Sequence, residues 1–152
     1  MSHPLHQFTY CPKCGARTFV ERNEKAKQCT TCGFVYYFNP SSAVACFIRN
    51  SKGELLLVRR AKEPAKGTLD LPGGFVDMYE SAEDAAHREV KEETGLDVTN
   101  ITYFGNQAWP YPSGLMVGFI ADYAGGEIKL QEEELSSGDF YTRDNLPELP
   151  QS

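Results

Sequence analysis

Residues 73–96 read GGFVDMYESAEDAAHREVKEETGL, and three of their acidic side chains are spaced i, i+3, i+4: Glu89, Glu92 and Glu93. On a helix these three side chains share one face. Like charges at this spacing repel, and each pair destabilises an isolated helix by roughly 0.2–0.5 kcal/mol. The cluster therefore indicates either a bound cation or a solvated surface.

The same stretch predicts a helix that begins near Ser81 and ends at Gly95. Ser81, with Asp84 three residues later, has the pattern of a capping box, and Gly95 suits the position just after a helix. An apolar stripe of small residues follows the helical period: Ala82, Ala85, Ala86 and Val90. Because the acidic side chains lie next to this stripe, we expect them to line a half-desolvated groove, where a divalent cation would offset their charge.

The chain has 152 residues and a formal net charge of −6, which is unevenly distributed. Residues 1–38 carry five Lys/Arg and two Asp/Glu, whereas the rest carries ten and nineteen. A charge of +3 is too small to indicate nucleic-acid binding by itself. No apolar run reaches the roughly 18–20 residues that span a bilayer, and no secretory signal is visible, so we expect no membrane partner and a cytoplasmic location.

Four cysteines form two CxxC pairs: Cys11, Cys14, Cys29 and Cys32. Four thiolates make the closed tetrahedral shell of a structural Zn²⁺, and a glycine follows each pair where a tight knuckle turn favours φ > 0. Unliganded or disulfide-bonded cysteines are the alternative, which a reducing setting disfavours. We therefore predict a zinc ribbon over residues 8–38, too small to fold without its metal.

Residues 39–152 are predicted to form one α/β domain around a mixed sheet. The apolar runs predict strands over residues 42–49, 54–59, 69–71, 98–106, 115–123 and 139–142, the first two as an antiparallel hairpin. An aromatic loop is expected over 106–113 and a capped helical turn over 142–146. Cys46 is expected to pack in the core, whereas Arg59, Arg60 and Lys62 could face phosphates or form a solvated basic edge.

Nine positions of the first stretch follow the spacing Gly-x5-Glu-x7-Arg-Glu-Val-x-Glu-Glu-x-Gly-Leu: Gly74, Glu80, Arg88, Glu89, Val90, Glu92, Glu93, Gly95 and Leu96. This pattern resembles the Nudix box. The resemblance implies an α/β/α sandwich and a Mg²⁺- or Mn²⁺-dependent pyrophosphohydrolase that acts on nucleoside diphosphates linked to another moiety. It also implies that Glu89, Glu92 and Glu93 bind the metal with the Gly74 carbonyl, and that Arg88 pairs with Glu80.

The implied chemistry also fits these residue types. Hard cations prefer oxygen ligands, and they can bridge a pyrophosphate and activate water for attack at phosphorus. A carboxylate that the metal does not fully engage can accept the proton of that water. Glu93 and Glu92 are both candidates for this base, and the sequence does not choose between them.

A four-cysteine ribbon before a Nudix body resembles the NADH pyrophosphatase branch of the family, some of whose members remove NAD caps from RNA. That branch carries Ser-Gln-Pro-Trp-Pro-Phe-Pro-x-Ser after the box, and residues 106–114 here read NQAWPYPSG. Gln107 and Trp109 match, as do both prolines, and Tyr111 is a conservative replacement. Asn106, Ala108 and Gly114 depart from the signature. The branch also usually carries a domain before the ribbon and a further segment after the last residues present here.

The branch resemblance assigns further site residues. Taken alone, the acidic run 131–135 reads as a solvated loop, but the resemblance implies that Glu134 is a fourth metal carboxylate. It places Phe75 and Tyr37 where the branch stacks a nicotinamide or adenine ring, with Tyr37 acting across a homodimer interface. Gln107 and Trp109 are the other expected substrate-binding residues.

Two functions of different classes follow. The first is an enzyme that hydrolyses the pyrophosphate bond of NADH, NAD or a related dinucleotide, including NAD-capped RNA, to two mononucleotides, with ADP-ribose or another linked nucleoside diphosphate as the alternative substrate. The second is a module that senses a nucleotide or binds nucleic acid without turnover. The intact set of Glu89, Glu92 and Glu93 favours the enzyme, since a sensor need not keep all three.

Overall fold

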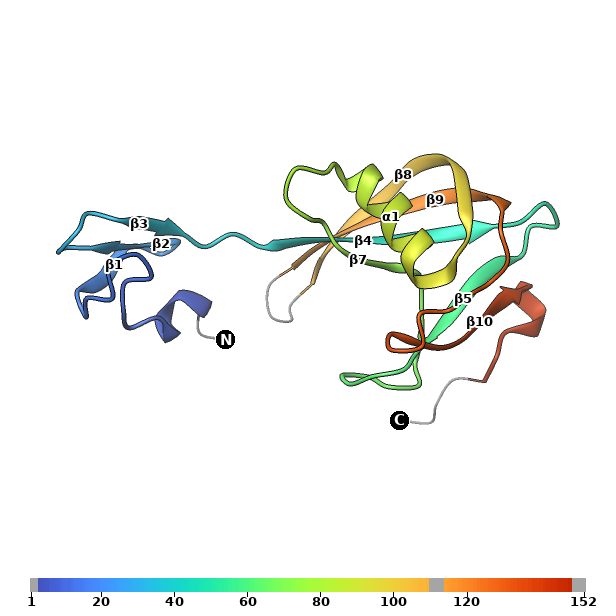
Figure 1. Ribbon diagram of the computed structural model, residues 1–152, viewed down its shortest axis with the longest axis horizontal. Coiled ribbons are helices and arrows are strands. Elements are labelled where there is room, and N and C mark those ends of the chain that lie inside the picture. Colours follow the sequence, from blue (N-terminus) through green and yellow to red (C-terminus); the bar gives the residue numbers. More distant parts are fainter. Residues whose placement is uncertain (1–2, 110–113, 149–152) are drawn as a thin grey trace. The chain divides into compact units, whose positions relative to one another are not determined.

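The computed structural model describes residues 3–109 and 114–148 (Figure 1). The described residues up to Pro40 form one compact unit, and those from Ser41 onward form a second. Each unit has a hydrophobic core of its own. No helix among the described residues is long and apolar enough to cross a membrane.

The first unit is a three-stranded antiparallel sheet preceded by a short 3-10 helix, η1 (Pro4–Gln7). Its strands are β1 (Phe19–Asn23), β2 (Ala26–Cys29) and β3 (Val35–Tyr37), in that order. The first two lie within a residue of the strands that the sequence suggests at residues 18–22 and 27–28, whereas β3 was not predicted. The buried core holds little more than Cys11, Phe19 and Cys29, which supports the expectation that the ribbon needs a metal to fold.

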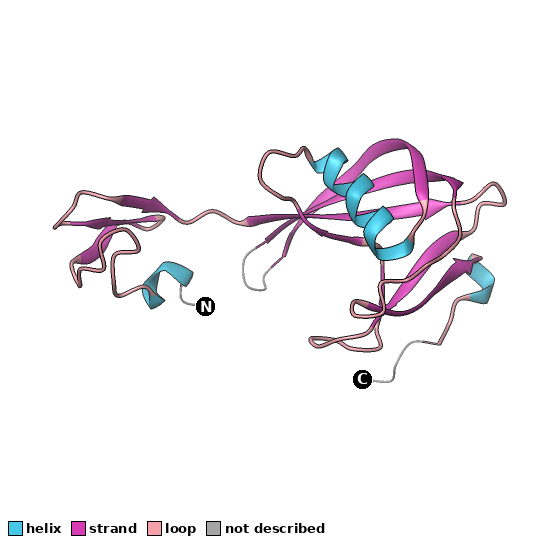
Figure 2. Ribbon diagram, viewed as in Figure 1, coloured by secondary structure: helices cyan, strands magenta, loops and turns pink. Residues whose placement is uncertain are grey.

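The second unit is built on a mixed seven-stranded sheet (Figure 2). Its strands are β4 (Ser41–Arg49), β5 (Leu55–Arg60), β6 (Leu69–Asp70), β7 (Gly73–Phe75), β8 (Asp97–Trp109), β9 (Gly114–Gly125) and β10 (Leu135–Tyr141). The main order is β10-β5-β4-β9-β8, with β6 beside β5 and β7 beside β4. The central β4–β9 pair is parallel, and the other pairs are antiparallel.

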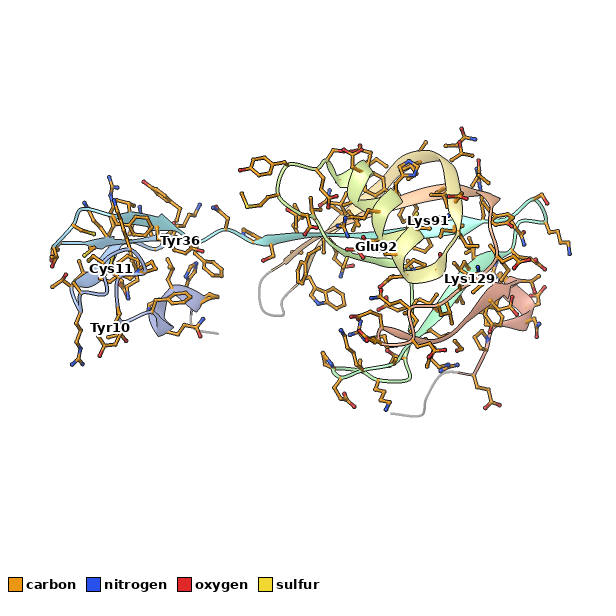
Figure 3. All side chains as sticks on the ribbon, in the orientation of Figure 1. Tyr10, Cys11, Tyr36, Lys91, Glu92 and Lys129 are labelled. Carbon is orange, nitrogen blue, oxygen red and sulfur yellow. The ribbon has the colours of Figure 1, made fainter. Side chains whose placement is uncertain are left out.

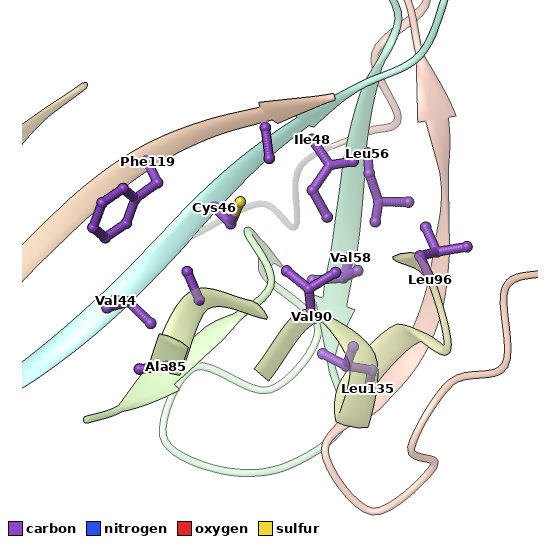
Figure 4. Close-up of a cluster of buried hydrophobic side chains, with 12 residues drawn as sticks. Val44, Cys46, Ile48, Leu56, Val58, Ala85, Val90, Leu96, Phe119 and Leu135 are labelled. Carbon is purple, nitrogen blue, oxygen red and sulfur yellow. The ribbon is translucent and has the colours of Figure 1, made fainter. Parts of the chain in front are cut away.

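One α-helix, α1 (Ala82–Thr94), packs on this sheet, and its ends form as predicted. Ser81 and Asp84 make a complete capping box, and Gly95 ends the helix with φ of 74°. Ala85, Ala86 and Val90 are fully buried against residues of β4, β5 and β9, and Figure 4 shows this cluster. Small side chains at these positions let the helix approach the sheet closely, which brings its neighbouring glutamates to the edge of the sheet.

Two predictions for this unit were wrong. Residues 106–109 continue strand β8 instead of beginning a loop, because they pair with the start of β9 from Asn106↔Val117 to Trp109↔Gly114. The rest of the expected aromatic loop, residues 110–113, lies outside the described residues. The turn after β10 is the 3-10 helix η2 (Arg143–Asn145), but the Thr142 side chain makes no capping hydrogen bond.

The mixed sheet with its long helix confirms the predicted fold class. In the described part of this unit, η2 is the one helical element besides α1. Cys46 is fully buried, and burial raises the pKa of its thiol to about 11, in keeping with a packing role.

Candidate active site

The four ribbon cysteines converge as a metal shell. Their Sγ atoms all lie within 4.8 Å of one another, and the Cys11–Cys32 and Cys14–Cys29 pairs are both 3.7 Å apart. Four sulfurs at about 2.3 Å from a tetrahedral Zn²⁺ would be separated by about 3.8 Å, so the spacing fits zinc. The Gly15 and Gly33 N–H groups donate to the carbonyls of Cys11 and Cys29, and both glycines have positive φ, as the knuckle turns require.

The surroundings of Cys29 favour its thiolate form. The Thr18 hydroxyl lies 3.4 Å from Cys29 Sγ, and this hydrogen bond, with further ones from the backbone of Cys32 and Thr31, lowers the pKa of Cys29 to about 6. Hydrogen bonds to the other thiols instead raise the pKa of Cys14. A thiol with a depressed pKa is readily present as the thiolate that zinc binds. The closed set of four thiolates leaves no open ligand position, so this site fits a structural metal.

The three clustered glutamates of α1, Glu89, Glu92 and Glu93, occupy different environments. Glu89 and Glu93 are partly buried, whereas the Glu92 side chain is 55% exposed. Figure 3 labels Glu92 on the helix. Burial is the main cause that raises the pKa of Glu93 to about 7; the charges of Glu89, Asp70 and Glu134 contribute to this rise, and a hydrogen bond from the Gly73 N–H at 3.0 Å opposes it. Burial also raises the pKa of Glu89. Paired carboxylates that resist ionisation in this way suit a divalent cation, which would favour their charged forms.

Gly73 and Gly74 lie where a side chain would meet close neighbours, namely backbone atoms at Gly73 and the Glu89 carboxylate at Gly74. A Cβ atom on Gly73 would lie 2.0 Å from the Val44 carbonyl oxygen, and one on Gly74 would lie 2.4 Å from Glu89 Oε1. Neither glycine has a positive φ. Two adjacent glycines suggest from the sequence a backbone conformation closed to other residues, and this interpretation was wrong: the β4 backbone leaves no room for a side chain at Gly73, and Gly74 lets the β7 backbone approach the Glu89 carboxylate.

Arg88 holds the loop before α1 onto the helix. Its guanidinium binds both carboxylate oxygens of Glu80, at 3.1 and 2.6 Å, and donates to the Phe75 carbonyl at 3.0 Å. The same guanidinium reaches Glu89 Oε1 at 2.9 Å and Glu92 Oε2 at 3.2 Å. The expected Arg88–Glu80 pair is thus present, and it also orients two of the acidic side chains.

Glu134 reaches the site through a segment that docks on the end of α1. The Lys129 and Gln131 N–H groups donate to the carbonyls of Thr94 and Glu93, at 2.8 and 3.0 Å. The Glu134 N–H then donates to the Gln131 carbonyl at 2.8 Å. This docking explains how a residue forty positions from Glu93 comes close enough to affect its pKa.

Most of the acidic groups of the site make ion pairs with basic side chains of the chain. Among the described residues, the four cysteines are the group whose ligand atoms all fall within 4.8 Å. Cations of the chain itself occupy the carboxylates: Arg88 contacts Glu89 and Glu92, and Lys62 contacts Glu134. In the described residues Glu93 has no such partner, and its carboxylate accepts only the Gly73 N–H. These carboxylates fit a divalent ion, and Glu93 is the one whose charge no basic side chain of the described residues offsets.

The predicted substrate-binding residues are distributed over both units. Phe75 follows Gly74 on β7 with 62% of its surface exposed, and its carbonyl is fixed by Arg88. Trp109 is exposed at the end of β8. Tyr37 lies in the ribbon unit, exposed at the end of β3, where Arg22 donates to its hydroxyl at 3.4 Å.

Gln107 lines a pocket of about 290 Å³ that the sequence did not predict, together with Ala45, Phe47, Leu71, Phe104 and Met116. Ala45 and Phe47 alternate along β4 with the core residues Val44, Cys46 and Ile48, so the pocket opens on the sheet face opposite α1. Asp70 is a second missed feature, an acidic neighbour of Glu93. No spacing pattern marks either one, because both depend on which strands become neighbours.

Family models match both parts of the chain. Residues 39–152 match the model described as NUDIX domain, and residues 6–37 match the NADH pyrophosphatase zinc ribbon domain. The chain therefore belongs to the Nudix family, and its ribbon is of the NADH pyrophosphatase type. Nudix hydrolases use divalent metal ions, and the four clustered cysteines support a structural zinc in the ribbon.

Curated relatives resemble the chain over almost its whole length. The NAD-capped RNA hydrolase NudC of Haemophilus influenzae (strain PittGG) is 40% identical over 153 residues, covering 99% of this chain and 58% of the relative. The protein of the same name from Mannheimia succiniciproducens is 42% identical over 158 residues, covering 99% and 59%. The chain thus spans less than two thirds of the length of these relatives.

Solved structures share the fold. A Nudix hydrolase from Nitrosomonas europaea superposes with a TM-score of 0.75 at 24% identity, covering 92% of this chain and 81% of that one. An ADP-ribose pyrophosphatase from Streptococcus suis superposes with a TM-score of 0.56 at 28% identity, covering 74% and 81%. These likenesses confirm the architecture that the sheet and helix define.

Proposed function

We propose that the chain hydrolyses the pyrophosphate bond of NADH, NAD or a related dinucleotide, NAD-capped RNA included, to two mononucleotides, using Mg²⁺ or Mn²⁺. The observation that carries the proposal is the partly buried pair Glu89 and Glu93, held against Gly73 and Gly74 at the edge of the sheet. The similarity to NAD-capped RNA hydrolases across both ribbon and body supports this substrate class.

The proposed division is a zinc ribbon over residues 8–38 and a catalytic domain over residues 39–152. The catalytic divalent ions are assigned to Glu89, Glu92, Glu93, Glu134 and the Gly74 carbonyl. When bound, such ions neutralise charge on the pyrophosphate and lower the pKa of water. Arg88 keeps Glu89 and Glu92 oriented toward this task through its contacts at 2.9 and 3.2 Å.

Glu93 is the better candidate for the general base. Its carboxylate is anchored by the Gly73 N–H and, among the described residues, pairs with no cation of the chain, so it is free to accept a proton. Glu92 is more exposed and shares its charge with Arg88. In this assignment Glu93 accepts the proton of the water that attacks phosphorus, and Glu92 acts as a ligand.

Exposed aromatic and polar side chains are assigned to binding the ring systems of the substrate. A planar ring of the substrate is assigned to stack on Phe75, which follows Gly74 and has an exposed ring. Gln107 and Trp109 are assigned to the same substrate from β8, and Tyr37 is assigned to stacking across a homodimer. A reducing, cytoplasmic location would keep the ribbon thiols available for zinc.

A substrate panel tests the proposal. NADH, NAD, ADP-ribose, FAD, diadenosine polyphosphates and NAD-capped RNA would be incubated with Mg²⁺ or Mn²⁺ and their products separated by chromatography. We expect AMP and nicotinamide mononucleotide from NADH or NAD. Glu93→Gln should lower turnover by roughly 10³-fold while the fold survives, because it removes the base. Glu83→Gln, on the exposed first turn of α1, is the matched control and should retain activity.

The panel also separates the alternatives. Hydrolysis of ADP-ribose in preference to NAD would favour the second candidate, which the likeness to an ADP-ribose pyrophosphatase at 28% identity supports. Full turnover in the Glu93→Gln variant would exclude the proposed mechanism. Salt-sensitive RNA binding without turnover of any substrate would instead favour a sensing module.

A further inference from the structure

Lys62 is a basic side chain that contacts a proposed metal carboxylate, Glu134, next to the pairing of strands β5 and β10. It lies just beyond β5, and its Nζ forms an ion pair with Glu134 Oε1. Backbone pairing brings the two residues together, because the Ala61 N–H donates to the Glu134 carbonyl at 2.8 Å and Arg60 pairs with Leu135. Figure 1 shows β5 and β10 side by side where this pairing begins.

The two neighbouring arginines are committed elsewhere. Arg59 donates to the carbonyls of Gly67 and Glu148, and Arg60 donates to the Pro64 carbonyl and pairs with Asp70 at 3.3 Å. These contacts hold the segment that follows β5 in place. Lys62 differs from both arginines because its partner, Glu134, is one of the carboxylates proposed to bind the metal.

The Lys62–Glu134 pair is suited to exchange. The Lys62 side chain is 53% exposed and that of Glu134 is 34% exposed. Ion pairs that are this exposed to water contribute little free energy. A divalent cation that binds Glu134 would therefore displace the Lys62 ammonium with only a small loss in its own affinity. A displaced lysine, with a flexible stem and a compact charge, would remain beside the carboxylates where a pyrophosphate must bind.

We propose that Lys62 is a positioning residue that changes partner during the reaction cycle. It neutralises Glu134 in the metal-free protein, and when a divalent cation takes Glu134 its ammonium binds a phosphate oxygen of the substrate. The proposal rests on the proposed function for its metal site and its substrate class. It assigns Arg59 and Arg60 to the scaffold and Lys62 to the substrate, which the sequence alone left open.

The first experiment measures metal affinity without substrate. Mn²⁺ binding to the zinc-loaded chain would be followed by calorimetry for Lys62→Met and for Lys66→Met, an exposed lysine of the same segment. We expect Lys62→Met to bind Mn²⁺ about 2- to 5-fold more tightly, because no ammonium competes for Glu134. Lys66→Met and the charge-conserving Lys62→Arg should match the wild type. In a Glu134→Gln background, Lys62→Met should have no effect.

The second experiment measures the phosphate contact. The probe is α,β-methylene ADP, whose carbon bridge cannot be hydrolysed, titrated at saturating Mn²⁺. Loss of one charge-assisted contact should weaken its binding about tenfold in Lys62→Met, with no change in Lys66→Met. KM for the best substrate of the panel should rise by a similar factor, while kcat changes less.

Three results would overturn the proposal. Unchanged Mn²⁺ affinity in Lys62→Met would mean that the ammonium does not compete for Glu134. An equal gain in the Glu134→Gln background would mean a general charge effect instead of an exchange. Unchanged binding of α,β-methylene ADP would exclude the phosphate contact. Because neither binding experiment needs turnover, failure of the proposed substrate would be seen separately, as a wild-type chain that hydrolyses nothing in the panel.

Discussion

Glu93 is subject to two opposing influences. Burial and the neighbouring negative charges disfavour its ionised form, whereas the Gly73 N–H stabilises that form through a hydrogen bond. The first influence is the larger, so the pKa rises to about 7. The carboxyl therefore destabilises the folded protein wherever it must ionise without a bound cation.

This coupling predicts a pH dependence of stability. The folded-state pKa of Glu93 is above its ordinary value of 4.5, so folding favours the protonated carboxyl. The contribution of Glu93 to the free energy of unfolding is therefore fully present below about pH 4.5 and is lost as pH rises through about 7. The free energy of unfolding of the wild type, relative to Glu93→Gln, should fall by about 2 kcal/mol between pH 5 and 8. This free energy is measured by urea unfolding of the zinc-loaded protein without other divalent ions, with Trp109 fluorescence as the signal. Parallel curves for the two proteins would contradict it.

Tyr79 is held in an unfavourable backbone conformation. Its φ is 73°, and its side chain is 100% exposed, in a turn that the Asp77 N–H and Glu80 Oε1 close at 2.7 Å. A left-handed conformation is costly for any residue with a Cβ atom, and the exposed ring gains no packing in return.

Replacing Tyr79 should therefore stabilise the protein. Tyr79→Gly is expected to raise the free energy of unfolding by about 0.5–1 kcal/mol, after the entropy cost of a glycine in the unfolded chain. Tyr79→Ala removes the ring and keeps the strain, so it should change little. Urea denaturation compares the three proteins, and an alanine variant as stable as the glycine variant would assign the effect to the ring.

Helix α1 begins at a complete capping box. The Ser81 hydroxyl accepts from the Asp84 N–H at 3.1 Å, and Asp84 Oδ2 accepts from the Ser81 N–H at 3.2 Å. Ser81→Ala should lower the free energy of unfolding by about 1 kcal/mol, because one helix-end donor loses its partner. Ser51→Ala, in the exposed turn between β4 and β5, is the control. Thermal unfolding by circular dichroism would show the difference, and equal midpoints would argue against the cap.

The sequence predicts this helix well because its signals are local. Ser81, Asp84 and Gly95 act within one turn of their own positions, so spacing alone identifies the ends. Glu134 could not be placed in this way, because its position depends on Gln131 and Lys129 docking on the last carbonyls of α1. The family resemblance supplied that residue, whereas residue spacing alone indicated a solvated loop.

Elements whose form depends on a distant partner were harder to predict. Residues 106–109 extend β8 because β9 pairs with them, and β3 forms because β2 is beside it. The sequence could not show that Val44 and Glu89 fill the space where Gly73 and Gly74 would carry a side chain. The pocket beside Gln107 combines residues of β4, β8 and β9, which only the sheet order brings together.

At the scale of the molecule, the two cores predict separate responses to zinc. Removal of zinc at neutral pH should unfold the ribbon, whose core is too small to persist, and leave the sheet around α1 folded. A thiol reagent should then modify four cysteines quickly and Cys46 slowly, because Cys46 is buried with a raised pKa. Circular dichroism on the same samples gives the retained structure. Fast modification of all five thiols would show that both units unfold together.

The parallel pairing of β4 with β9 also sets an order of events during synthesis. Ser41 pairs with Gly114 and Arg49 with Asp122, so the centre of the sheet must wait until β9 has left the ribosome. The ribbon is complete at Tyr37, about 90 residues before β9 ends at Gly125. At roughly 5–20 residues per second this is a delay of about 5–20 s. Nascent chains arrested between these lengths should already protect their ribbon thiols with zinc, while β4 still lacks its central neighbour.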